Sequence, residues 1–199
     1  DLFTMFMFYE VALIPMYLLI GVWGSGQKEY AAMKLTLMLM GGSAFLLIGI
    51  LGIFYGAGGD TMNLLDIAQR HIPTEIQHLF FPLIFLGFGA LGALFPFHTW
   101  SPDGHASAPT AVSMLHAGVL MKLGGYGCFR VAMFLMPEGA EMWGNFFLIL
   151  TTISVVYGAF SAVVQTDLKY INAYSSVSHC GLVLFALLMM TRTSCTGAI

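Results

Sequence analysis

Long apolar segments constrain this sequence more than any other feature. Each segment is about 20 residues or longer and nearly free of charge, and together they cover residues 2–23, 33–55, 77–97, 108–135, 143–165 and 170–190. A bilayer with a hydrocarbon core about 30 Å thick needs about 20 apolar residues per helical crossing. The segments are continuously apolar and lack the alternation of an outer-membrane barrel. The sequence therefore predicts an all-α, polytopic transmembrane helical bundle with about six transmembrane helices.

Composition excludes several classes of protein. Only 9% of the 199 residues are charged, 58% are hydrophobic and the mean hydropathy is +0.85, whereas a soluble domain is about 25% charged. The net charge of −3 comes without a basic patch, so nucleic acid is not an expected partner. Cys128, Cys180 and Cys195 show no CxxC spacing, and we interpret them as small packing residues rather than metal ligands or a disulfide pair.

Domain organisation follows from the even spread of the apolar segments. Nothing divides them, so residues 1–199 are expected to form a single membrane domain. The chain begins with Asp1 directly before an apolar segment and carries no signal peptide pattern. We expect it to be an internal piece of a longer protein.

Two charges lie within the apolar segments at the depth of the hydrocarbon core. Glu10 lies near the middle of the first segment and Lys122 near the middle of the fourth. A charge there costs at least about 2.5–3.5 kcal/mol if it faces lipid, so both side chains should face protein or water. A buried ion pair kept for structure is one interpretation. The other is a proton relay, because burial disfavours the charged form of amino and carboxyl groups and so favours proton exchange.

The segment 96–110 contains three prolines, one glycine and the polar residues His98, Asp103 and His105. We expect it to break the helix, and a break at membrane depth requires polar partners or water. Three interpretations remain open: a weak metal site, an interfacial loop that caps the following helix, or a polar entrance that feeds protons toward Lys122.

Other polar residues extend the hypothesis of a relay. Tyr126 follows Lys122 by four residues and shares its helical face. His116 precedes Lys122 in the same segment, and His179 follows a serine-rich stretch in the sixth segment. Each histidine is either a satisfied buried group or a proton carrier. The short connection 165–169, with Asp167 and Lys169, is predicted to be a capped turn at the membrane surface.

Several sequence strings resemble one known family. They are HTWSPDGH followed by APT within 98–110, AGVLMKLGGYG at 117–127, QTDLK at 165–169, AYSSVSH at 173–179 and EVALIPMY at 10–17. These strings resemble the antiporter-like, proton-pumping membrane subunits of respiratory complex I, and the last one resembles the subunit M, or subunit 4, branch. The resemblance covers nearly the whole chain. It implies that the chain spans about transmembrane helices 5 to 10 of about fourteen.

The resemblance also implies roles for individual residues. Glu10 matches the family's intramembrane glutamate, Lys122 its central relay lysine, and His179 a histidine on the path between two half-channels. The family pairs its glutamate with a second lysine, and Leu91 occupies that position here. This departure leaves Glu10 without the partner that the family provides.

The function implied by the resemblance is that of a proton-translocating subunit of NADH:quinone oxidoreductase. NADH, FMN, iron–sulfur clusters and quinone are expected in other subunits, and no cofactor is expected in this chain. The implied partners are lipid and other membrane subunits of complex I, above all the neighbouring antiporter-like subunits. The implied location is an energy-transducing membrane, foremost the bacterial inner membrane, with the mitochondrial inner membrane and the thylakoid as alternatives. Alternative functions are a subunit of a multi-subunit cation/proton antiporter or membrane-bound hydrogenase, and a non-conducting structural subunit.

Overall fold

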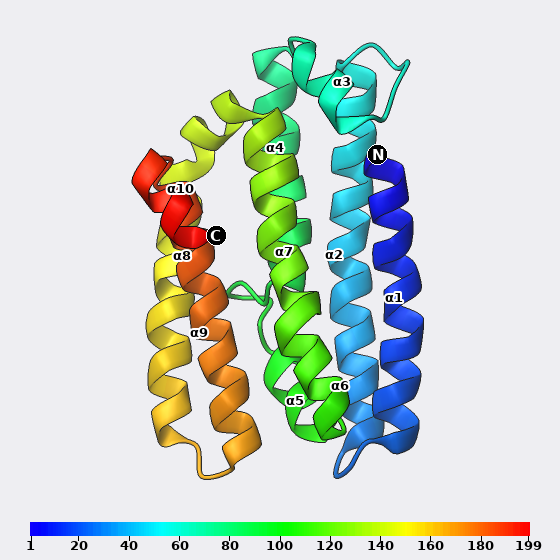
Figure 1. Ribbon diagram of the computed structural model, residues 1–199, viewed down its shortest axis with the longest axis vertical. Coiled ribbons are helices and arrows are strands. Elements are labelled where there is room, and N and C mark those ends of the chain that lie inside the picture. The colour runs from blue at the N-terminus through cyan, green and yellow to red at the C-terminus, as the bar shows by residue number, and fades with distance from the viewer.

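The computed structural model describes all of residues 1–199 and is built from helices alone, which confirms the predicted fold class (Figure 1). The long helices run side by side and form an elongated bundle. In chain order the elements are α1 (Leu2–Trp23), α2 (Lys28–Gly56), α3 (Leu64–Gln69), α4 (Thr74–Leu91), α5 (Trp100–Ser107), α6 (Thr110–Leu115), η1 (His116–Leu120), α7 (Met121–Gly127), η2 (Cys128–Met133), α8 (Pro137–Val164), α9 (Leu168–Leu188) and α10 (Arg192–Ala198).

Five helices are long and apolar enough to cross a membrane, namely α1, α2, α4, α8 and α9. The fourth predicted segment differs from a single regular helix. It is a continuous helical run over residues 110–133 in which the π-helical stretches η1 and η2 lie on either side of α7. A π-helical turn widens the helix by one residue and often occurs at a functional site. The prediction of six similar helices therefore corresponds to five regular ones and one segmented one.

The helix break predicted over 96–110, between the third and fourth crossings, is present but begins earlier and is shorter. An irregular stretch over 92–99 separates α4 from α5, and α5 continues past Pro102 and Gly104. We expected those two residues to prevent a helix. Pro102 lies in the first turn of α5, where its missing N–H has no intrahelical partner to lose. The indole Nε1 of Trp100 donates to the carbonyl of Ala90 over 3.0 Å and so links the two half-helices across the break.

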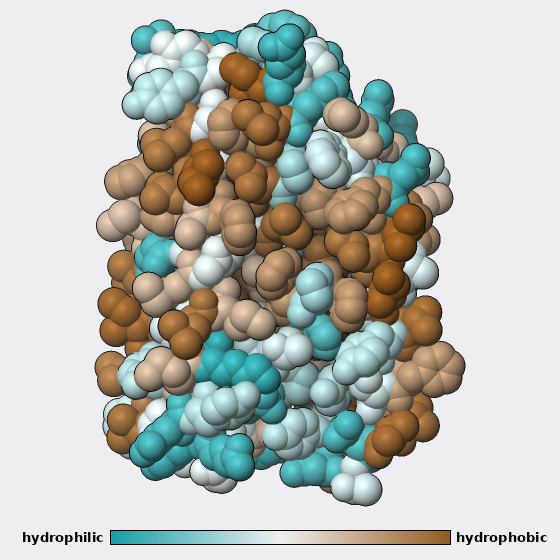
Figure 2. Space-filling view, turned by 180° about the vertical axis from the view of Figure 1, so that it is seen from behind, coloured by the Kyte–Doolittle hydropathy of each residue, from teal (hydrophilic) through white to brown (hydrophobic).

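The helices are arranged so that α1 and α2 lie on one side of the bundle and α8 and α9 on the other, with α4 and α7 between them (Figure 1). The short helix α3 covers one end, and α5 and α6 lie at the opposite end. On the face seen in Figure 2, hydrophobic side chains form a broad band across the middle, and most polar residues lie toward the two ends. This distribution is what a bundle immersed in a bilayer requires.

The central helix α4 is held to its neighbours by aromatic and small residues. The rings of Phe85 and Phe147 have centroids 4.4 Å apart and join α4 to α8. Between α4 and α2, a Cβ added to Gly87 would lie only 2.9 Å from the carbonyl oxygen of Gly42. Glycine at such crossings lets helix backbones approach closely, which is how helices pack when lipid surrounds them.

Candidate functional site

The half-helix α5 is anchored by an ion pair that the sequence did not reveal. Lys34 of α2 donates from Nζ to Oδ2 of Asp103 over 2.6 Å. The hydroxyl of Tyr170 in α9 lies 3.5 Å from the other carboxylate oxygen of Asp103. The two charged side chains are mostly buried, with 24% and 27% of their surface exposed. Asp103 is therefore engaged by two neighbouring helices.

Two of the predicted histidines lie together beside α5. The ring of His116 stacks between the rings of Trp100 and His105, at centroid distances of 5.0 and 4.5 Å. His116 is fully buried and His105 is 1% exposed. Gly104 lies beside this stack, since a Cβ there would be 3.5 Å from Cε1 of His116, at ordinary contact distance. The sequence predicted the individual histidines, and the fold brings them into contact.

The hydrogen bonding of this stack is incomplete. Nδ1 of His105 lies 2.9 Å from the hydroxyl of Ser113, but Nε2 of His105 and both ring nitrogens of His116 have no partner. Stacked rings present their faces to each other, so no N–H···N bond joins the pair. A proton that passes between them requires a ring rotation or a bridging water. Buried polar atoms without partners are uncommon and costly, which marks this pair as a functional candidate.

His98 lies in the break itself. It is 5% exposed, and its Nδ1 has no hydrogen-bond partner. Its ring packs edge-on against Tyr157 at 4.9 Å and stacks on Phe95 at 5.6 Å. His98 therefore belongs to an aromatic cluster that is separate from the stack of Trp100, His116 and His105.

Lys122 lies on α7 and is exposed at the surface of this chain. It lines a cavity of about 360 Å³ whose wall is mostly apolar, and Tyr126 lines the same cavity. The nearest polar partner of the amine is the thiol of Cys180 in α9, with Nζ and Sγ 3.7 Å apart. The prediction that Tyr126 shares the face of Lys122 is supported, although no hydrogen bond joins them. Cys180 is 5% exposed and belongs to the hydrophobic core, as expected of a packing residue, and its thiol also contacts the candidate relay.

Glu10 and Lys122 do not form an ion pair. The two ion pairs of the structure join Lys34 to Asp103 and Arg70 to Asp60. Oε1 of Glu10 is buried and has no hydrogen-bond partner. An interpretation of Glu10 and Lys122 as a static structural pair therefore finds no support.

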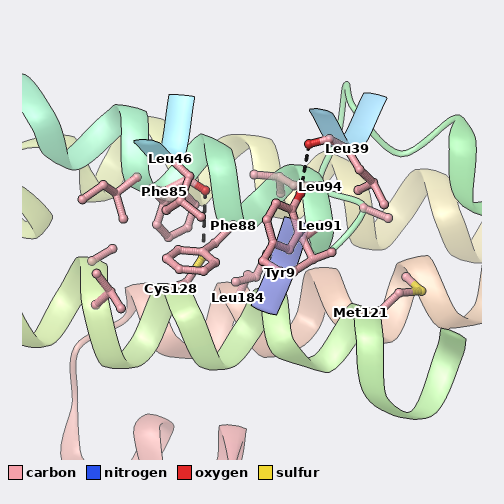
Figure 3. Packing of buried hydrophobic residues seen from close by; sticks show 14 of the residues in the cluster. Tyr9, Leu39, Leu46, Phe85, Phe88, Leu91, Leu94, Met121, Cys128 and Leu184 are labelled. Carbon is pink, nitrogen blue, oxygen red and sulfur yellow. Dashed lines mark hydrogen bonds between the residues drawn. The ribbon is translucent and has the colours of Figure 1, made fainter. Parts of the chain in front are cut away.

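Leu91 occupies the position at which the resemblance implies a lysine. It is 1% exposed and belongs to the apolar cluster that includes Tyr9, Leu94 and Leu184 (Figure 3). The cluster around Leu91 accommodates an apolar side chain at this position.

His179 lies apart from the other candidates. It is exposed on α9 and makes no hydrogen bond, although the adjacent Cys180 contacts Lys122. The predicted capped turn before α9 is confirmed, since Oδ1 of Asp167 accepts from the backbone N–H of Lys169. The side chain of Lys169 extends from that turn toward α5. Its amine donates to the carbonyls of Ala106 and Ala108, at 3.2 and 3.1 Å, at the end of α5.

No group of three or more His, Cys, Asp or Glu side chains is close enough together to hold a metal ion. Asp103, one of the three ligands considered from the sequence, is occupied by Lys34. The arrangement of α5, η1 and α7 instead offers buried imidazoles and one amine, which are groups that bind and release protons.

Comparison with known proteins gives a consistent result. The family model described as NADH:quinone oxidoreductase/Mrp antiporter, TM, matches residues 1–199. The chain is 42% identical over its whole length to an NAD(P)H-quinone oxidoreductase chain 4 of Picosynechococcus sp. and 40% identical to the chloroplastic chain 4 of Citrus sinensis. It covers 36% and 40% of those proteins, so it spans well under half of their length.

Solved structures agree. The chain superposes on part of the respiratory complex I of Thermus thermophilus with a TM-score of 0.93 and 30% identity, covering all of this chain and 42% of that one. A membrane-bound sulfane sulfur reductase, described as an archaeal respiratory membrane complex, matches with a TM-score of 0.85 and 30% identity over 94% of this chain and 39% of that one. The broken third crossing, the buried histidine stack and the intramembrane lysine thus occur in a chain that belongs to the NADH:quinone oxidoreductase/Mrp antiporter transmembrane family.

Proposed function

We propose that this chain forms the central part of a proton-translocating membrane subunit of an NAD(P)H:quinone oxidoreductase, in which Lys122 is the main proton-carrying group. It corresponds in this proposal to about transmembrane helices 5 to 10 of about fourteen. The observation that carries the proposal is the placement of the Lys122 amine. It lies beside a cavity, in a helix flanked by two π-helical stretches, and has a thiol rather than a carboxylate as its partner.

The side chains of this chain support a stepwise path for protons. Asp103 and Lys34 form a polar group at the end of the bundle where α5 lies, and His105 of α5 stacks on His116 of η1. Lys122 follows His116 in the same helical run after the π-helical stretch η1. In the proposed order, a proton enters near α5, passes the histidine pair and reaches the amine. His98, Tyr126 and His179 border this path as further candidates.

The energy stored across the membrane explains why such a path needs groups that are accessible from one side at a time rather than an open channel. Moving one charge against 100 mV costs about 2.3 kcal/mol, and a continuous wire would let that energy leak back. The amine of Lys122 contacts a thiol rather than a carboxylate, so no ion pair has to break when the amine changes its partner. Glu10, which lacks a partner because Leu91 replaces the expected lysine, has a smaller role in this proposal.

The rest of the assembly is proposed to supply the redox chemistry. NADH or another donor, FMN, iron–sulfur clusters and quinone belong to other subunits in this proposal. The neighbours of the chain are further membrane subunits, including antiporter-like ones, and lipid. The cyanobacterial and chloroplast relatives favour an energy-transducing membrane such as the thylakoid or a bacterial inner membrane.

A second candidate is a subunit of a cation/proton antiporter or of another respiratory membrane complex. The family description names the Mrp antiporter, and the sulfane sulfur reductase has a closely similar fold. The residues around Lys122 fit either function, because both move a proton through the same helices. Identification of the subunits that copurify with the full-length protein decides between them.

The test of the relay is Lys122→Ala in the full-length protein within its assembled complex. We expect proton translocation per electron transferred to fall strongly while the amount of assembled complex stays unchanged. Leu123→Ala is the matched control, because Leu123 is the next residue and is 41% exposed. Unchanged translocation in the Lys122→Ala variant would reject the relay.

A further inference from the structure

The half-helix α5 ends inside the bundle with carbonyl groups that need partners. The last carbonyls of any α-helix have no intrahelical N–H to accept from. At the end of α5 the N–H of Ala108 donates to the carbonyl of Gly104, and the N–H of Ser25, in the turn between α1 and α2, donates to the carbonyl of Ser107. The carbonyls of Ala106 and Ala108 are left for a side chain to satisfy.

Lys169 supplies that side chain from a different helix. It lies in the first turn of α9, and its amine donates to Ala106 and Ala108 at 3.2 and 3.1 Å. A cation at a helix C-terminus is favourable because the aligned peptide dipoles place partial negative charge there. The contact is partly buried, so water competes with it only weakly.

The same two helices also meet the rest of the candidate site. α5 carries His105, whose ring stacks on His116 at 4.5 Å. α9 carries Cys180, whose thiol contacts Lys122. A shift of the end of α5 relative to α9 therefore changes the geometry of the histidine pair and its distance from the lysine site together.

We propose that Lys169 is a positioning residue that fixes the end of α5 to α9 and so holds His105 in register with His116. This inference rests on the proposed function, because its consequence is the rate of proton transfer. Lys169 does not carry the proton itself, since its donors are committed to backbone carbonyls. Its role extends beyond the local turn, which Asp167 caps alone.

The experiment compares Lys169→Met, Lys169→Arg and Lys28→Met in the full-length protein within its assembled complex. Lys28 is the matched control, because its amine also donates to a backbone carbonyl, that of Val22 at 2.8 Å, but makes no hydrogen bond to α5. Two quantities are measured. One is amide hydrogen exchange of the peptide that contains α5, and the other is the number of protons translocated per electron.

For Lys169→Met we expect exchange in α5 to accelerate about tenfold, within the range that a partly buried charge at a helix end contributes, and translocation per electron to fall. Lys169→Arg, which keeps the charge and the donors, should restore both quantities, and Lys28→Met should change neither. The inference is overturned if Lys169→Met and Lys28→Met give the same exchange in α5 and the same translocation per electron. It is also overturned if Lys169→Met accelerates exchange in α5 but leaves translocation unchanged. Failure of the proposed function appears separately, as normal translocation in the Lys122→Ala variant.

Discussion

The contact between α7 and the end of α4 leaves no space for a single added methyl group at Gly124. A Cβ at this position would lie 2.4 Å from the backbone nitrogen of Gly92 and 2.7 Å from the carbonyl oxygen of Phe88. Ordinary contact for such an atom begins at 3.4 Å, so Gly124→Ala requires α7 to move by about 1 Å. The obstructing atoms belong to the backbone and cannot rotate away. The cost should therefore lie at the upper end of the usual range for overpacking, at about 3 kcal/mol.

Gly118→Ala is the matched control, because it lies in the same helical run and a Cβ there meets nothing within 4 Å. Both substitutions gain the same helix propensity of about 1 kcal/mol, so their difference isolates the clash. About 3 kcal/mol corresponds to a melting temperature lowered by about 6–12 °C in a protein of 150–250 residues and by less in a longer one. The melting temperatures are measured by thermal unfolding of the purified full-length variants. Equal melting temperatures for Gly124→Ala and Gly118→Ala would refute the packing argument.

Two further predictions concern burial. Phe147→Ala should lower the free energy of unfolding by about 3–5 kcal/mol, because the fully buried ring packs at 4.4 Å against Phe85, whereas Phe160→Ala, at a position 71% exposed, should have little effect on thermal unfolding. Leu91→Ala should destabilise the protein by about 2–5 kcal/mol, because it removes a side chain that is 1% exposed and leaves a cavity in the apolar cluster. Leu91→Met keeps the volume and should cost less than about 1.5 kcal/mol, so equal thermal stability of these two variants would show that Leu91 does not contribute to the packing.

Hydropathy was sufficient to predict most of the fold. Segments such as 2–23 are apolar throughout, and lipid requires their backbone to be helical, so their number and approximate bounds follow from the sequence. The π-helical stretches η1 and η2 could not be predicted in this way, because their residues are as apolar as those of a regular helix. The helical state of Pro102 and Gly104 depends on their position within α5, which composition does not give.

The candidate site could be predicted residue by residue but not as an arrangement. A charge or histidine such as Lys122 or His116 stands out in an apolar segment because of its cost in lipid. Which residues meet depends on contacts between distant helices. The approach of Cys180 to Lys122, the pairing of Lys34 with Asp103 and the donation from Lys169 to α5 are all of this kind. A small thiol in an apolar helix carries no signal that distinguishes it from a packing residue.

The end of α4 in the middle of the bundle has an electrostatic consequence of its own. Aligned peptide groups leave the equivalent of about half a negative elementary charge at the C-terminus of a helix. Gly92, directly after that terminus, lines the same cavity as Lys122 and lies against the turn of α7 that holds it. The backbone thus maintains a standing negative potential beside the cavity that no side-chain substitution removes.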